Sequence, residues 1–254
     1  MIYPIFKTRY SFYKSILNIE ANKSEEDAPD NILDIAEEHQ LPYITIVDDA
    51  MAGFLHITKC CKKRKIPFKF CLRCTFADYE GKNQHKCVIF LSDGDKSAYE
   101  NLIKLSTICN KKAASEQGEP YLTYDEYRES QAGLHLFIPF YDSFIFNNMF
   151  TLSSFAPSLS GIDYTLVVED HDTPFDAPLK RAIENFAKLE NKPIVNWHTC
   201  YYKNNSDIEA YQCLKLMNRS DFKGKDNTLN NPNLNDCCSD KFSFEHFLKL
   251  QNNG

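Results

Sequence analysis

Tyr43-Ile-Thr-Ile-Val-Asp-Asp-Ala50 is the stretch that decides the fold of this chain. Its β-branched residues, which follow Leu41-Pro42, predict a buried strand. The strand ends at two adjacent carboxylates, Asp48 and Asp49, and a Lys-rich stretch that is expected to be helical follows. Because chemistry collects at the carboxyl ends of strands in α/β proteins, both aspartates are candidate functional residues. The alternative is that one of them only caps the next helix by accepting hydrogen bonds from its first N–H groups.

Outward from this stretch, apolar runs with strand character alternate with segments of helical periodicity. Strands are predicted at 2–6, 43–47, 66–76, 87–91, 134–140, 164–168 and 193–197, and helices near 30–36, 52–64, 97–108, 123–127, 178–190, 207–217 and 244–250. Ser97, Thr123 and Ser243 are the expected N-caps of three of these helices. Residues 141–157 are apolar without a clear period. The alternation predicts a mainly parallel α/β fold, either a barrel or an open sheet.

Length and composition limit the functions that this chain can have. The chain has 254 residues, of which 43% are hydrophobic and 25% charged, enough for one α/β barrel or two smaller domains. Its net charge of −6 gives no overall attraction to nucleic acid or to an anionic membrane. No apolar run approaches the roughly 20 residues of a membrane span, and the N-terminus is too polar for a signal peptide. We therefore expect no membrane association and a cytoplasmic protein with its ten cysteines reduced.

Cys71 and Cys74 form a C-x-x-C pair, which raises the question of a zinc site. A structural zinc site usually needs a second such pair or a well-spaced pair of histidines, and the sequence has neither. If the strand that contains them is regular, the two thiols also point to opposite faces. Zinc at this pair is therefore disfavoured.

Four segments together carry a resemblance to a known family. They are 8–15 (Thr-Arg-Tyr-Ser-Phe-Tyr-Lys-Ser), 46–50 (Ile-Val-Asp-Asp-Ala), 98–106 (Ala-Tyr-Glu-Asn-Leu-Ile-Lys-Leu-Ser) and 193–201 (Pro-Ile-Val-Asn-Trp-His-Thr-Cys-Tyr). In order and spacing they resemble the PHP (polymerase and histidinol phosphatase) domain of bacterial DNA polymerase III α subunits. The resemblance implies a single domain over 1–254 with a distorted (β/α)7, TIM-like barrel. We expect 218–240, which is Asn-rich, to be a mobile loop, and 241–254 to form a C-terminal helix and tail.

The chain departs from this family where the metal ligands are expected. Active members hold up to three divalent metals with His, Asp, Glu and Cys side chains at the strand ends. By alignment with the family motifs, Lys7 replaces a His-x-His position, Lys14 an Asp, Asp49 a His and Arg73 a Glu. Lys and Arg offer no lone pair to a metal at neutral pH, and each adds a positive charge. We therefore expect no multinuclear metal cluster.

Some residues with metal-binding chemistry remain. Asp48, Asp49, His198 and Cys200 could together hold at most one zinc or manganese ion, and His85 lies near a further ligand position of the family. The preferred expectation is that no metal or other cofactor binds.

A different arrangement follows from the charges. Carboxylates that share a pocket repel one another unless a cation lies between them. We expect Lys7, Lys14 and Arg73 to supply that cation by pairing with Asp48 and Asp49. The alternative is that the basic side chains point to solvent and the pocket has collapsed.

Three functions remain open. The first, implied by the resemblance, is a non-catalytic scaffold in DNA replication or repair that binds a DNA polymerase or a proofreading exonuclease, and DNA only through that complex. The aromatic residues of 141–155 are its candidate contacts, and the sequence contains no polymerase active site. The second is a metal-dependent phosphoesterase or 3′–5′ exonuclease with one metal, against which the basic substitutions argue. The third is a sensor that grips phosphate or a nucleotide with Lys7, Lys14 and Arg73.

Overall fold

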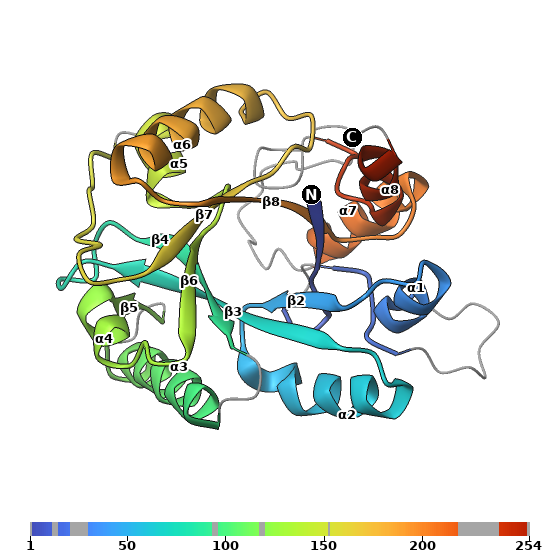
Figure 1. Ribbon diagram of the computed structural model, residues 1–254, viewed down its shortest axis with the longest axis horizontal. Helices are drawn as coiled ribbons and strands as arrows, with labels where there is room; N and C mark the ends of the chain where they lie inside the picture. Colours follow the sequence, from blue (N-terminus) through green and yellow to red (C-terminus); the bar gives the residue numbers. More distant parts are fainter. Residues whose placement is uncertain are drawn as a thin grey trace.

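In the computed structural model, residues 2–11, 15–20, 30–92, 96–116, 120–151, 153–217 and 239–252 are described. Seven strands of this part of the chain close into a barrel (Figure 1). They are β1 (Ile2–Phe6), β2 (Ile44–Asp48), β3 (Phe68–Ala77), β4 (His85–Leu91), β6 (Leu134–Ile138), β7 (Tyr164–Val168) and β8 (Ile194–Cys200). Neighbours around the barrel follow the chain order, and β1 and β8 pair to close it. The short strand β5 (Leu122–Thr123) adds to the end of β3.

One barrel strand runs against the others. β4 is antiparallel to both β3 and β6, whereas the other barrel pairings are parallel. The polar turn at 78–84 explains the reversal, because the Asp78 carboxylate accepts the backbone N–H groups of Glu80 and Lys82 and so closes a hairpin. Gly81 and Asn83 supply the positive φ values that the hairpin requires. The expected α/β barrel is thus confirmed, but a hairpin stands where a regular βα repeat would place a helix.

The helices pack on the outer face of the barrel (Figure 1). They are α1 (Ile32–Glu38), α2 (Phe54–Arg64), α3 (Lys96–Glu116), α4 (Tyr124–Glu129), α5 (Phe144–Phe150), α6 (Asp176–Glu190), α7 (Ile208–Met217) and α8 (Phe244–Asn252). Thr123 forms a capping box with Glu126, and the Ser243 hydroxyl accepts the backbone N–H of His246 at 3.0 Å, as expected for N-caps. Helix α5 lies in the stretch for which the sequence predicted no element.

The apolar side chains form two layers because successive residues of a strand point to opposite faces. A small inner cluster of Ile5, Val47, Cys71, Val88, Val167 and Trp197 fills the barrel. A larger outer cluster joins the barrel to its helices and includes Cys74. Cys71 and Cys74 therefore lie on opposite faces of β3, as expected, and cannot share one zinc ion.

Two sequence predictions on segments beyond the barrel have different outcomes. The predicted C-terminal helix is present as α8, which packs against β1 and β8. Most of the predicted loop at 218–240 lies outside the described residues. Within the part of the chain that the structure describes, no helix combines the length and apolarity that a bilayer crossing requires.

Candidate functional site

The candidate site is the mouth of the barrel, where the parallel strands end. A cavity of about 70 Å³ opens there. Its charged lining comes from Lys7 after β1, Arg73 on β3, Asp142 after β6 and Glu169 after β7. Its remaining lining includes the aromatic side chains of Tyr141, Trp197, Tyr201 and Phe242. Residues from all seven barrel strands or their ends and from the C-terminal segment therefore meet in one small space.

An ion-pair cluster occupies the wall of this mouth. Lys7 Nζ lies 3.3 Å from Asp49 Oδ1, and Arg73 Nη1 lies 3.6 Å from the same oxygen. The guanidinium of Arg73 also pairs with Asp142. Only 6% of the Lys7 side chain and 12% of the Arg73 side chain is exposed. Burial alone would lower the pKa of Arg73, but Asp49 and Asp142 outweigh it and raise that pKa.

Asp48 has a different role from its neighbour because it points away from the barrel interior. Its carboxylate accepts the backbone N–H of Thr8 at 3.0 Å, the Thr8 hydroxyl at 2.7 Å and the Ser11 hydroxyl at 2.7 Å. Burial raises the pKa of Asp48, and this effect outweighs the three hydrogen bonds, which lower it. Asp48 thus ties the segment after β1 to the end of β2.

The helix-capping interpretation of the two aspartates does not fit the structure. The short 3₁₀ turn Met51–Gly53 follows β2 and has Ala50 at its N-cap, and Gly53 is the N-cap of α2. Neither aspartate stands at an N-cap position. Their roles are instead a hydrogen-bonded tie and an ion-pair centre.

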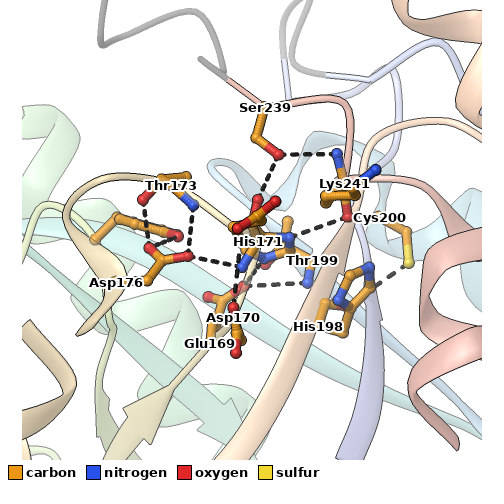
Figure 2. A network of polar contacts seen from close by, with 12 residues as sticks. Glu169, Asp170, His171, Thr173, Asp176, His198, Thr199, Cys200, Ser239 and Lys241 are labelled. Atoms are coloured by element: carbon orange, nitrogen blue, oxygen red, sulfur yellow. Dashed lines mark hydrogen bonds and ion pairs between the residues drawn. The ribbon is translucent and has the colours of Figure 1, made fainter. Parts of the chain in front are cut away.

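Glu169 is the centre of a second network at the mouth (Figure 2). Its Oε2 accepts His171 Nε2 at 2.8 Å and the backbone N–H of Thr199 at 3.1 Å. The other ring nitrogen of His171, Nδ1, lies 3.2 Å from the carbonyl oxygen of Lys241. The two ring nitrogens of His171 thus each face one acceptor oxygen. Burial would raise the pKa of Glu169, but the hydrogen bond and charge of His171, with the Thr199 N–H, lower it.

The same network fastens the C-terminal segment over the mouth. Asp176, at the start of α6, accepts the backbone N–H of His171 at 2.8 Å (Figure 2). It also accepts the hydroxyl of Tyr141 at 2.6 Å. Phe242 stacks on the His171 ring, with centroids 3.8 Å apart and planes at 11°. The backbone N–H of Tyr201 donates to the Phe242 carbonyl at 2.9 Å. Phe242 is therefore held where it lines the mouth cavity.

Besides Asp48, three of the predicted site residues lie on the outer face of the barrel wall. His198 Nε2 is 3.0 Å from the carbonyl oxygen of Ser243, and burial, with the charge of His171, lowers the pKa of His198 to about 3. Cys200 is fully buried, which raises the pKa of its thiol. His85 Nε2 bonds the Tyr124 hydroxyl at 2.6 Å and so supports α4.

The structure therefore brings together only part of the predicted site. Lys7, Asp49 and Arg73 meet at the mouth, whereas Asp48, His198, Cys200 and His85 face outward, because alternate strand positions point to opposite faces. The four proposed ligands of a single metal do not converge. Lys14 lies outside the described residues.

Sequence reasoning did not select Glu169. One signal was available: Glu169 comes directly after the predicted strand 164–168. Asp49 likewise comes directly after β2. The contact that holds this network, between His171 and the Lys241 carbonyl, joins residues 70 positions apart, so no local pattern predicts it.

Comparison with known proteins gives little further information. No family model matches the chain, and no curated protein matches its sequence. Among solved structures, the chain is similar to one described as a metal-dependent phosphoesterase from Bifidobacterium adolescentis. The TM-score is 0.43 and the identity 10%, over 65% of this chain and 79% of the other. A similarity this distant carries no argument about activity.

Proposed function

We propose that this chain is a non-catalytic, metal-less protein with a PHP-like barrel that acts as a binding module. The observation that carries the proposal is the position of the Asp49 carboxylate between Lys7 and Arg73 inside the barrel mouth. The resemblance places both basic residues where active relatives have metal ligands.

The physical argument concerns charge. A buried carboxylate needs a positive neighbour, and in metal-dependent enzymes a divalent cation can fill that role. Here an ammonium and a guanidinium group do so and are part of the chain itself. A divalent cation that approached Asp49 would meet two charges of its own sign, and neither basic group can act as a ligand. The donor set at the mouth therefore does not fit a metal that activates water for hydrolysis.

The size of the mouth supports the same proposal. Its cavity measures about 70 Å³, whereas pockets for small molecules usually measure roughly 300–1,000 Å³. Phe242, which stacks on His171, forms the wall of this cavity on the side of the C-terminal segment. A phosphodiester substrate would not fit without displacing this segment.

The proposed partner is a DNA polymerase or proofreading exonuclease subunit, by resemblance to the polymerase III α family, and DNA would be reached only through that complex. The exposed apolar side chains of Met149 and Phe150 on α5 support a protein contact. They lie within 141–155, the stretch expected to supply contact residues.

Affinity purification of the full chain from its native host tests this function. We expect a polymerase or exonuclease subunit, identified by mass spectrometry, to co-purify with the wild-type chain and to be lost with Phe150→Asp. The matched control Tyr79→Asp, on the exposed β3–β4 hairpin, should retain it. A wild-type chain that captures neither subunit and hydrolyses a phosphodiester in the presence of manganese would contradict the proposal.

A further inference from the structure

A second hollow lies beside the mouth, and its volume is nearly three times that of the mouth cavity. It measures about 200 Å³, compared with about 70 Å³ for the mouth cavity. Its walls are the residues after β2, the end of β3, the start of β4 and the middle of α3. Its lining includes Asp49, Met51, Arg73, Thr75, Lys86 and Pro120. We call this hollow the rim pocket.

The charged lining of the rim pocket is predominantly positive. It contains two cations, Arg73 and Lys86, and one carboxylate, Asp49. With Lys7 and Asp142, which pair with Asp49 and Arg73 from the mouth side, three positive charges stand against two negative ones. The two thiols in the lining add no negative charge near neutral pH, since burial raises the pKa of Cys109 to about 11 and that of Cys74 also rises. A ligand with negative charge is therefore favoured over a neutral or positive one.

Both cations are held in position before any ligand arrives. Asp49 and Asp142 fix the guanidinium of Arg73, and Lys86 Nζ donates to the Thr75 hydroxyl at 2.5 Å. Donors that are already ordered lose little conformational entropy on binding. Arg and Lys together suit a phosphate group, the first through a planar fork of N–H groups and the second as a point charge.

The rest of the lining suggests the size and character of the ligand. The hydroxyls of Thr75 and Ser106 can donate to further phosphate oxygens, whereas Met51, Leu72 and Pro120 form an apolar part. A volume of about 200 Å³ lies below the roughly 300–1,000 Å³ of pockets for drug-sized molecules. The ligand is therefore small, with a short apolar body attached to its charged end.

We propose that the rim pocket binds a small phosphate monoester, with the phosphate between Arg73 and Lys86 and the organic part against Met51, Leu72 and Pro120. This site is separate from the protein contact proposed on α5 and does not depend on which partner binds there. Because Arg73 and Asp49 line the rim pocket and also form the ion-pair cluster at the mouth, an occupied pocket would contact that cluster directly.

Titration calorimetry on the full chain tests the proposal, with glycerol 3-phosphate as the probe and with inorganic phosphate and glycerol as comparison arms. We expect one equivalent of the monoester to bind, more tightly than inorganic phosphate, with no heat from glycerol. Lys86→Met removes one charge-assisted contact and should weaken binding roughly tenfold or more. Lys82→Met, the same change on the exposed hairpin, should leave the affinity unchanged.

A second variant keeps the test decisive if Lys86→Met does not fold. Asn110→Asp places a carboxylate in the lining from an exposed position on α3 and should also weaken binding roughly tenfold or more. Asn252→Asp makes the same change at the exposed end of α8 and serves as its control. Absence of binding to the wild-type chain at millimolar monoester, or equal affinities for Asn110→Asp and Asn252→Asp, would overturn the proposal. If Lys86→Met loses affinity for the monoester but still co-purifies with the protein partner, the two proposals stand or fall separately.

Discussion

The ammonium of Lys7 lies 3.3 Å from the carboxylate of Asp49 inside the barrel mouth, on residues 42 positions apart in the sequence. Arg73 approaches the same oxygen from β3, which pairs with β2 on the side opposite to β1. Arg73 also pairs with Asp142, whereas Asp49 is shared by both nearly buried positive charges. The stability of the mouth should depend on that carboxylate more than on any exposed charge.

The substitution Asp49→Asn tests this dependence. Because it leaves two buried cations with less negative charge, we expect the free energy of unfolding to fall by about 3–5 kcal/mol. Urea unfolding measures the change. The control Asp125→Asn breaks an exposed pair with Arg128 and should cost about 1 kcal/mol or less. Equal losses for the two variants would show that the mouth ion pairs contribute no more than surface pairs.

The tie between Asp48 and the segment after β1 is a separate prediction. Thr8→Val removes a buried hydroxyl that donates to Asp48 at 2.7 Å, and we expect a loss of about 1–3 kcal/mol. The matched control is Thr107→Val, because that exposed hydroxyl bonds only within α3, to the carbonyl of Ile103. Unfolding midpoints that agree for these two variants would argue against the tie.

The buried ring of His198 should make stability depend on pH. An unfolded histidine takes up a proton near pH 6.5, whereas folded His198 does so only near pH 3, so between these values the unfolded state binds more protons. This contribution to stability is present above pH 6.5 and is lost as the pH falls toward 3. In His198→Asn, which can still donate to the Ser243 carbonyl, the decline between pH 6.5 and 3 should be shallower than in the wild-type chain. If the free energy of unfolding declined equally with falling pH in both proteins, His198 would not be the source of this pH dependence.

Much of the fold could be predicted from local sequence. The β-branched runs gave the barrel strands, and Thr123 and Ser243 marked helix starts where the structure has them. Two features lay beyond such patterns. A short apolar run such as Cys87–Leu91 does not reveal its direction, which the Asp78 turn decides. Helix α5 has only seven residues, five of them apolar, so no helical period stands out from its sequence.

The candidate site was harder to predict because it depends on strand phase. A shift of one residue exchanges the inner and outer faces, so sequence alone could not decide which of Asp48 and Asp49 enters the barrel. The expectation that basic residues approach these carboxylates came from the alignment of Lys7 and Arg73 with family ligands. The Glu169–His171 network escaped prediction because it depends on the distant segment around Lys241.

Metal content is the most direct test of the central claim that Lys7 and Arg73 take the place of divalent ions beside Asp49. The full chain, purified without chelator and incubated with excess zinc or manganese, should be desalted and analysed by inductively coupled plasma mass spectrometry, with Asp49→Ala as the comparison. We predict less than stoichiometric metal in both proteins. One or more equivalents bound to the wild-type chain and lost in Asp49→Ala would contradict the account.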